Sequence, residues 1–559
     1  MWDSNCPSKS FDNPTRSNAV LTLDSSPGCS VNCGVRLTVT NTNGGTASCD
    51  SNVRVRDTLP PQVTCPNPIT LKRGDKICDN DVQDWLDSFS ASDRCSATED
   101  IDMRNDAPEC GFPAGTTTTV KFDARDDCDN VASCTSEITI DPLQRVASDQ
   151  KGSLLVFSKV EVRWDAKGNL IQDTVLDVSN EADGNSVDVQ AYFINGDVQV
   201  DQDEDANGNI LRTFEPGWNT ADCRFQLTQH QPHFWSAAKG STKCQPFSVL
   251  DMDGPGRVDP TATDGSRVLR GFVVMWAVDF QFPRVAGDTA DGRWNEIRWN
   301  DLKGDAIIIN YAEGSAWEYN AWAYQNTCVE KGAPIRDCTD RDRNGVCCEA
   351  RPVPGVLPID GFSYDVNFDT LLLDFYASGS TGLTRSGVTV MVDTELVTHS
   401  MDIDLRQDGR GPVLTKVEAE IFNENESKFS GTRRCMCCWD GTDLGDYVRD
   451  ESAPNHFLRT KLGTNKGTAR LDGVDSDECD YEEVCNVDRM RRPERPMRIR
   501  PGRMPGTPLL GVAVKELTFT GAIQKVERAG TNLVGVGEES SVIRYDRAEG
   551  TGELQGGGE

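Results

Sequence analysis

The sequence predicts an all-β protein, and three observations support this prediction. Short segments of alternating apolar and polar residues recur along the 559 residues, separated by turns rich in Gly, Asn and Asp. Such alternation is typical of strands that bury one face. The 49 glycines and 27 prolines supply many turn positions. The 21 cysteines predict disulfide bonds, which stiffen small β-sandwiches that bury little apolar area.

The cysteines also indicate where the protein resides. Only four histidines are present, so metal cages explain the cysteines poorly. Disulfides form in oxidising compartments, and each typically adds ~2–4 kcal/mol of stability. We therefore expect an extracellular or cell-surface protein. No signal peptide precedes "MWDSNCPSKS", so we expect a processed form or a fragment of a longer chain.

Charge and hydropathy narrow the classes of partner. The net charge of −32 and the isoelectric point near 4.5 argue against a nucleic-acid partner and are compatible with calcium. The best apolar run, "GFVVMWAVDF" at 271–280, is far shorter than the ~18 residues of a membrane-spanning helix and contains an Asp. The sequence predicts no membrane span.

The first 145 residues contain an internal repeat. "GVRLTVTNTNGGTASCDSNVRVRD" at 34–57 has the same order of strand, turn, Ser-Cys and alternating apolar residues as "TTVKFDARDDCDNVASCTSEITID" at 118–141. We expect a partial module at 1–58 and a complete one at 59–145. The first copy lacks the opening strand, so its edges would be exposed. We expect either upstream sequence or a strand from a neighbouring molecule to complete it.

Four motifs of the complete module carry a family resemblance. They are "DTLPPQVTCP", "SASDRCS", "FPAGTTT" and "DCDNVASC" in this order. This segment resembles the hyalin repeat (HYR), and the resemblance covers residues 59–141 and part of 1–58. It implies an immunoglobulin-like β-sandwich of extracellular adhesive proteins and supplies no catalytic residues. Asp129 departs from the pattern, because it replaces the usual glycine before Asn130.

The cysteines of the complete module are expected to pair among themselves. Cys128 and Cys134 flank its last hairpin, and we expect their partners among the other four. Six cysteines allow 15 pairings, so the connectivity stays open. The six predicted disulfide residues are Cys65, Cys78, Cys95, Cys110, Cys128 and Cys134.

Residues 151–550 form a larger β-rich region in this prediction. "SLLVFSKVEVRW", "LIQDTVLDVS" and "SVDVQAYFING" follow one another across Gly/Asn/Asp turns, which predicts an antiparallel meander within a β-sandwich. No convincing amphipathic helix exceeds two turns. Cysteine-rich or polar loops are expected at 327–358 and 440–508, two subdomains are possible, and 551–559 is a glycine-rich tail that we expect to be disordered.

This larger region also resembles a β-rich domain of secreted bacterial proteins. The stretches "GSLLVFSKVE", "GSAWEYNAW", "FSGTRRCMCCWD" and "AGTNLVGVG" carry the resemblance. That family has no established activity, so the resemblance implies secretion and a bacterial type of protein but no mechanism.

Two acidic loops are candidate calcium sites. Alternate oxygen ligands before a glycine form the first half of an EF-hand loop, although neither loop has the bidentate Glu at position twelve. An acidic turn capped by Asx hydrogen bonds is the alternative. The candidate ligands are Asp340, Asp342 and Asn344 in one loop and Asp203, Asp205 and Asn207 in the other.

The stretch "SAWEYNAWAY" is a candidate glycan site within the tryptophan-rich region 294–324. On an extended strand, Trp317 and Tyr319 point one way while Trp322 and Tyr324 point the other. Aromatic rings can stack on the apolar faces of sugars. Buried strands of a sandwich core would use the same residues, so core packing is the alternative.

The functional prediction is a structural or adhesive extracellular protein that binds other proteins or glycans and self-associates. A glycan-binding or glycan-cleaving protein is the alternative. The common nucleophile, phosphate-binding and metalloprotease motifs are missing, so we expect no enzyme. Paired carboxylates stay open, because acidic residues are too numerous for their spacing to be informative.

Overall fold

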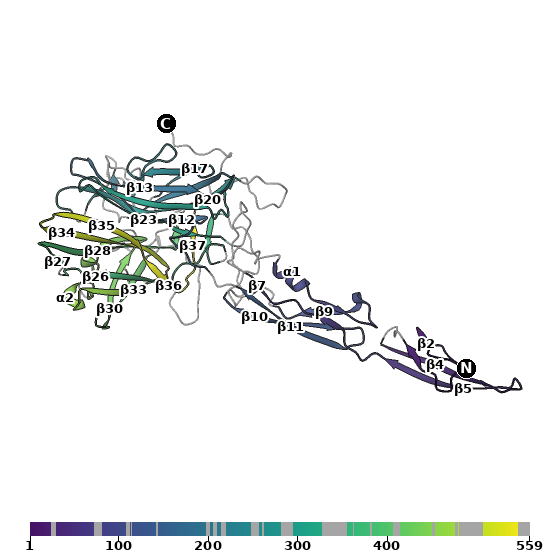
Figure 1. Ribbon diagram of the computed structural model, residues 1–559. Helices are drawn as coiled ribbons and strands as arrows, with labels where there is room; N and C mark the ends of the chain where they lie inside the picture. Colours follow the sequence, from purple (N-terminus) through teal and green to yellow (C-terminus); the bar gives the residue numbers. More distant parts are fainter. Residues whose placement is uncertain are drawn as a thin grey trace. The chain divides into compact units, whose positions relative to one another are not determined.

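The computed structural model places two compact units along the chain, at 1–140 and 144–545, and both are built almost entirely of strands (Figure 1). This confirms the all-β class. Neither of the two short α-helices in the described part of the chain has the length and apolarity needed to cross a membrane. The structure describes residues 1–23, 29–71, 81–107, 112, 115–140, 144–196, 202–204, 210–213, 220–247, 257–259, 262–280, 294–326, 355–361, 363–380, 383–405, 414–449, 453–475, 479 and 507–545.

The first copy of the repeat forms a sheet of three antiparallel strands and a separate pair of strands. Alternating residues would make one face of the larger sheet apolar, yet only Cys6, Cys33 and Val35 are buried hydrophobic residues among the described positions before Asp57. The sheet has the order β1 (Trp2–Ser4), β4 (Ser30–Thr40) and β5 (Thr46–Arg56), and the pair is β2 (Lys9–Phe11) with β3 (Leu21–Leu23).

The second copy has two sheets with a shared core. Phe122 and Ile138 lie at its centre, and Trp85 of the short helix α1 (Asp81–Asp87) packs on Phe122. The larger sheet has the order β7 (Ile69–Leu71), β11 (Val131–Ile140), β10 (Thr117–Arg125) and β9 (Asp102–Asn105). The smaller pairs β6 (Gln62–Thr64) with β8 (Ser90–Ser92), and a 3-10 turn follows at Thr98–Asp100.

The two copies share the register of their long hairpins. Leu37 lies opposite Cys49 in β4–β5, and Phe122 lies opposite Cys134 in β10–β11. The Ser-Cys step therefore occupies the same position in both hairpins. The outer strand is also equivalent, because β1 pairs with β4 as β9 pairs with β10.

The second unit is built around an eleven-stranded sheet. Its main path is β17 (Thr220–Leu227), β14 (Val187–Asn195), β20 (Arg267–Phe280), β12 (Leu154–Trp164), β13 (Leu170–Asn180), β22 (Leu302–Asn310) and β23 (Ser315–Asn320). Four short strands extend it, namely β18 (Pro232–Ser236) on β13, β19 (Arg257–Val258) and β21 (Trp294–Glu296) on β20, and β24 (Trp322–Tyr324) on β12.

Smaller sheets complete the second unit. Two of them have five strands each. The first has the order β31 (Lys428–Met436), β30 (Thr415–Asn423), β33 (Lys466–Asp475), β26 (Thr370–Tyr376) and β36 (Val534–Val536). The second has the order β27 (Leu383–Arg385), β28 (Val388–Ser400), β34 (Leu509–Gly521) and β35 (Lys525–Asn532), and β32 (Trp439–Asp443) pairs with β28. The others are β25 (Val356–Ile359), β37 (Ser541–Arg544) and β29 (Ile403–Asp404), and the pair β15 (Gln202–Glu204) and β16 (Ile210–Thr213). Helix α2 spans Arg459–Leu462, and a 3-10 turn spans Leu444–Asp446.

The eleven-stranded sheet is buried on both faces. Val273 and Met275 of β20 belong to one core cluster, while Val274 and Trp276 belong to the other. A strand covered on both faces needs apolar residues at every position, which explains the continuous run "GFVVMWAVDF".

The predicted meander is only partly correct. β12 and β13 pair across the turn at Asp165–Asn169, but β14 pairs with β17 and β20 and lies away from β13. The place beside β13 is taken by β22. The alternation of residues therefore predicted the strands, while their order depends on contacts distant in sequence.

Candidate metal centre in the second module

The acidic turn of the second module is one of four similar turns in the described part of the chain. Asp126 Oδ1 accepts hydrogen bonds from the backbone N–H of Cys128 at 2.9 Å and of Asn130 at 2.8 Å. Asn41, Asp165 and Asn423 accept from the residues two and four positions later in the same way. An Asx side chain at the first position therefore fixes each of these turns.

The fourth position of each turn has a left-handed backbone. Glycine fills it at Gly44 (φ 80°) and Gly168 (φ 82°). Asp129 (φ 69°) and Glu426 (φ 60°) fill it in the other two turns. Asp129 thus occupies the position where the hyalin-repeat pattern has glycine, and the structure shows why glycine suits it.

The cysteines that flank this hairpin form two different kinds of bridge. Cys134 pairs with Cys65 of the same module, with 6.0 Å between their Cα atoms, as expected. The predicted partners of Cys128 were wrong, because it pairs with Cys29 of the first copy. Cys128 lies in the exposed turn at the end of the hairpin, where it reaches another module, whereas Cys134 lies on a strand beside the core.

The remaining predicted disulfide residues have different outcomes. Cys95 is a free thiol in this structure, so its predicted bridge was wrong. Cys95 lies in the loop after β8, close to the carboxylates of Asp57 and Asp93. Cys78 and Cys110 lie outside the described residues. Cys49 of the first copy is the second free thiol within 1–140 of the described chain, and it is exposed.

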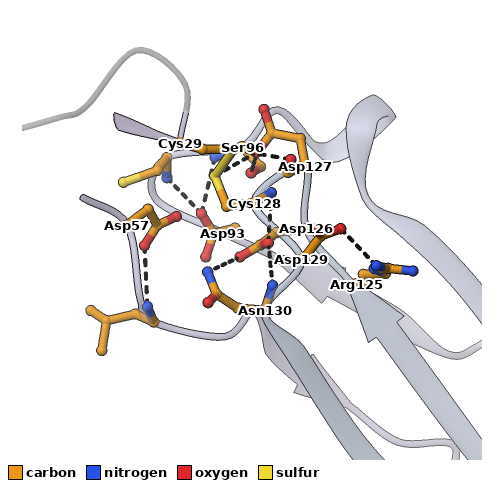
Figure 2. The surroundings of a disulfide bond; sticks show 12 residues. Cys29, Asp57, Asp93, Ser96, Arg125, Asp126, Asp127, Cys128, Asp129 and Asn130 are labelled. Atoms are coloured by element: carbon orange, nitrogen blue, oxygen red, sulfur yellow. Dashed lines mark hydrogen bonds and ion pairs between the residues drawn. A yellow bond between two sulfur atoms is a disulfide. The ribbon is translucent and has the colours of Figure 1, made fainter. Parts of the chain in front are cut away.

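Two carboxylates and the free thiol of Cys95 converge beside the Cys29–Cys128 disulfide. One ligand atom each from Asp57, Asp93 and Cys95 lies within 4.8 Å of the other two. Asp57 directly follows β5, and the other two follow β8. Figure 2 shows Asp57 and Asp93 facing each other across this site. The smaller sheet and the entry of the chain into the module therefore position the three groups.

The hydrogen bonds of the site leave one carboxylate oxygen without a donor among the described residues. Asp93 Oδ1 accepts from the backbone N–H of Cys95 at 2.7 Å and of Ser96 at 3.0 Å. Asp57 Oδ1 accepts from the N–H of Leu59 at 3.2 Å (Figure 2). Asp57 Oδ2 is buried and has no hydrogen-bond partner among the described residues. A buried polar atom without a partner typically costs about 1–3 kcal/mol, and more if it is charged.

A second group of similar composition lies close by but differs in chemistry. Asp127 and the two cysteines Cys29 and Cys128 also bring ligand atoms within 4.8 Å. Both of these sulfurs belong to the disulfide, so neither can become a thiolate ligand. Asp127 instead accepts a hydrogen bond from the Ser96 hydroxyl through Oδ1 (Figure 2).

The sequence contained a partial signal for this site. Asp93 and Cys95 belong to the motif "SASDRCS" that carries the family resemblance, and Asp57 ends the first hairpin. Two carboxylates and a cysteine of this kind are frequent metal ligands. Their convergence depends on pairing between β6 and β8, which the sequence did not reveal.

The predicted calcium loops are not part of this site. Asp340, Asp342 and Asn344 lie outside the described residues, as do Asp205 and Asn207. The backbone of Asp203 belongs to β15, but its side chain is outside the described part of the structure. The calcium prediction at these loops stays a prediction.

The predicted glycan platform has its rings in the core. Trp317 is 8% exposed and Tyr319 4%, and both pack in one cluster, whereas Trp322 (3%) and Tyr324 (0%) pack in the other. The prediction that the two pairs face opposite ways is therefore correct. The sugar-stacking role at these rings conflicts with their burial, because a sugar needs an accessible ring face.

Hydrogen bonds confirm that two of these rings are structural. The Tyr319 hydroxyl donates to the carbonyl oxygen of Lys159 at 2.5 Å, and the Tyr324 hydroxyl donates to Asn367 Oδ1 at 2.6 Å. Burial raises the pKa of Tyr324 well above its ordinary value. Core packing, the alternative interpretation, accounts for all four residues.

An open groove on the second unit is lined by aromatic and charged residues. Its volume is about 460 Å³, within the usual range of ligand sites. Tyr376 and Phe422 are half-buried there, and Asp374 and Glu424 are exposed. The lining residues are Asp374, Phe375, Tyr376, Phe422, Asn423, Glu424, Lys466, Gly467, Thr468 and Lys515.

Comparisons with solved structures give weak similarities. The tetra-tandem repeat in the extending region of a large adhesion protein is 11% identical, with 91% of this chain and 83% of that chain covered, at a TM-score of 0.12. The M60 catalytic domain with the CBM51-1 and CBM51-2 domains from Clostridium perfringens ZmpB is 9% identical, with 86% and 50% covered, at 0.11. TM-scores this low support no argument about fold or function.

A third solved structure is equally distant. The CupB6 tip adhesin from Pseudomonas aeruginosa is 8% identical, with 77% of this chain and 98% of that chain covered, at a TM-score of 0.08. The curated proteins contain no match to the sequence. A family model gives the informative comparison: residues 56–140 match the HYR domain, the family that the motifs of this segment resemble.

Proposed function

We propose that the protein is a secreted or cell-surface structural and adhesive protein that self-associates. The HYR match at residues 56–140 supports an extracellular module. Three disulfides between described residues of 1–140 support an oxidising compartment, because such bonds persist there. In this proposal the modules are spacers for the second unit.

One observation carries the proposal of self-association. Two hairpins with the same register differ in burial at three equivalent positions of one face. Val39 of the first copy is 57% exposed, whereas Ala124 at the equivalent position is 0% exposed. Val53 and Val55 are half-buried, whereas the equivalent Ile138 and Ile140 are buried. The second copy covers this face with β6 and β8, and the described strands of the first copy include no counterpart of these two.

The β5 edge of the first sheet also has no partner strand among the described residues. β5 has eleven residues and pairs with β4 on one side, whereas its counterpart β11 has β7 on the other side. A long unpaired edge is a template for a strand from another chain. Cys49 is equivalent to Cys134, whose partner Cys65 follows β6, so the same missing layer leaves Cys49 as a thiol. A second copy that covers this face would satisfy all three features.

The test is a substitution on the exposed face. Val39→Lys places a charge on the face that a second copy would cover, while the side chain stays solvated in the single chain. We expect the full chain to self-associate as its concentration rises, and Val39→Lys to need at least tenfold higher concentration for the same association. Light scattering coupled to size-exclusion chromatography measures this.

Val131→Lys is the matched control for that experiment. Val131 is 51% exposed on β11 of the complete module, so its substitution should leave association unchanged. A full chain that stays monomeric at every concentration would contradict self-association. If Val39→Lys and Val131→Lys weaken self-association equally, the effect is a general one of charge, and the exposed face of the first copy is not the interface.

Glycan binding is the second candidate function, and the groove beside Tyr376 supports it. Two half-buried aromatic rings lie there with two exposed carboxylates, the combination that favours sugar stacking and hydroxyl recognition. The Lys466 ammonium lies 4.8 Å from the centre of the Tyr376 ring and would meet anionic groups. We therefore place the candidate glycan contact at this groove.

A glycan array probed with the full chain tests the second candidate. A hit that Tyr376→Ala removes, and that Tyr311→Ala retains, would support the groove. Tyr311 is the matched control because its ring is 52% exposed elsewhere on the second unit. An array without hits, or hits unaffected by Tyr376→Ala, would contradict glycan binding at this site.

A further inference from the structure

We propose that Asp57, Asp93 and Cys95 bind a divalent cation of the zinc type, with the Cys95 thiolate as one ligand. The site lies within the HYR match and is independent of the proposed self-association. Three donor atoms from two separate chain segments lie within 4.8 Å of one another. Tetrahedral ligands of zinc lie about 3.3–3.8 Å apart, given metal–ligand bonds of ~2.0–2.3 Å, so a small contraction completes the geometry.

The first reason is the state of Asp57. The residue is 8% exposed, and Oδ2 is buried without a hydrogen-bond partner in the described part of the chain. Figure 2 shows Oδ1 held by the backbone while the other oxygen faces Asp93. A buried carboxylate oxygen aimed at a second carboxylate is unfavourable without a positive charge between them.

The second reason is the lack of an ion-pair partner for either carboxylate in the described part of the chain. Neither Asp57 nor Asp93 forms an ion pair among the described residues, and both accept hydrogen bonds from backbone N–H groups. Structural carboxylates in this module do pair with cations, as Asp123 does with Lys121 at 2.8 Å. A bound cation would supply the charge that this site lacks.

The third reason is the thiol, which selects the type of cation. Calcium and magnesium take oxygen ligands, whereas zinc takes cysteine sulfur, histidine nitrogen and carboxylate oxygen. Cys95 stays a thiol although Cys65, Cys128 and Cys134 of the same module are bridged. On binding, the thiol releases its proton to solvent and the sulfur joins the two carboxylates. Three protein ligands leave one position for water or a further ligand.

The site would connect two parts of the module. Asp57 belongs to the segment by which the chain enters the module, and Asp93 and Cys95 belong to the loop after β8. A cation held by both would restrain them in the folded state only, so binding would stabilise the module.

Zinc chloride is the probe for this proposal, and cadmium is its spectroscopic substitute. The full chain is used without reductant, with Cys49→Ser as the background so that the exposed thiol cannot bind metal. We expect calorimetry to show one zinc ion per chain. Cadmium should produce the ultraviolet absorption of a sulfur–cadmium bond.

Two variants then separate the ligands. Asp57→Asn and Cys95→Ser should each lower the zinc affinity at least tenfold, and Cys95→Ser should remove the cadmium absorption. Asp127→Asn is the matched control, because Asp127 lies beside the same disulfide outside the three donors. It should leave zinc binding within about twofold. Unreduced peptide maps and circular dichroism of each variant confirm that the module is folded.

Three results would overturn the proposal. The first is no zinc binding by the folded parent protein. The second is zinc binding that Cys95→Ser leaves unchanged. The third is calcium binding that depends on Asp57 and is indifferent to Cys95, which would assign the carboxylates to a site made of oxygen ligands.

Discussion

At the scale of single residues, the four Asx turns allow a controlled comparison. Asp129 and Glu426 occupy left-handed positions that Gly44 and Gly168 fill in the equivalent turns. We expect Asp129→Gly to raise the unfolding free energy of the first unit by roughly 0.5–1 kcal/mol, because glycine removes the steric cost of a positive φ. The ion pair between Asp129 and Arg125 is exposed and offsets little of this gain.

Glu426→Gly is the parallel test in the second unit, and chemical denaturation measures both variants. Asp129→Ala separates the effect of the carboxylate from that of the backbone, because alanine removes the carboxylate but keeps the strain of the positive φ. A gain in both Asp129→Gly and Asp129→Ala would show that the carboxylate, and not the backbone, was unfavourable.

A buried histidine predicts how stability depends on pH. His399 is fully buried in the second unit, with Nε2 3.0 Å from the Ser158 hydroxyl and its ring stacked on Phe272. Burial lowers the pKa of His399 to about 4. The unfolded chain takes up this proton near pH 6.5, so the folded state loses stability as the pH falls from 6.5 towards 4.

The loss due to His399 should reach about 2 kcal/mol between pH 7 and pH 5. Denaturation followed by tryptophan fluorescence reports the second unit, which contains all tryptophans except Trp2 and Trp85. His399→Gln should reduce the pH-dependent loss by that amount. An identical pH dependence in both proteins would contradict a neutral, buried His399.

At the scale of elements, the Cys29–Cys128 bridge sets the connection between the two copies. Its sequence separation is 99 residues, against 27 for Cys6–Cys33. In the chain-entropy model the longer loop contributes about 4–5 kcal/mol and the shorter one about 3–4 kcal/mol. We expect Cys29→Ser/Cys128→Ser to lower the denaturation midpoint of the first unit more than Cys6→Ser/Cys33→Ser does.

Peptide mapping without reduction checks the connectivity itself. Alkylation of the unfolded, unreduced protein should label Cys49 and Cys95 within residues 1–145. A peptide that links Cys128 to Cys95 would contradict the structure and restore pairing within the second module.

The elements also show how far sequence reasoning reaches. The alternation in "TTVKFDAR" and "SEITI" predicted β10 and β11, because one face of each strand is buried. The pairing of β14 with β20 could not be predicted, since about seventy residues separate these strands and alternation carries no information on partners. The partner of Cys128 depended in the same way on contacts between modules.

The candidate site shows a similar division. The individual residues Asp93 and Cys95 stand in a motif that the sequence displays, so their importance was visible. The burial of Asp57 and its proximity to Asp93 and Cys95 follow from tertiary packing. The prediction of a surface site at the aromatic stretch was wrong because of packing. Alternation correctly placed Trp317 and Trp322 on different faces, but it carries no information that both faces are covered.

At the scale of the whole molecule, the proposed self-association rests on the contrast between the buried hairpin of the second copy and the more exposed hairpin of the first. Self-association should protect β5 in proportion to concentration, because backbone N–H groups at an open edge exchange freely with solvent. β11 of the covered module supplies an internal reference.

Hydrogen exchange of the full chain at low and high protein concentration is therefore the most direct measurement. We expect the protection of residues 46–56 to rise with concentration while that of residues 131–140 stays constant. Protection of residues 46–56 that is high and independent of concentration would contradict it, because the first copy would then be a complete fold in the single chain.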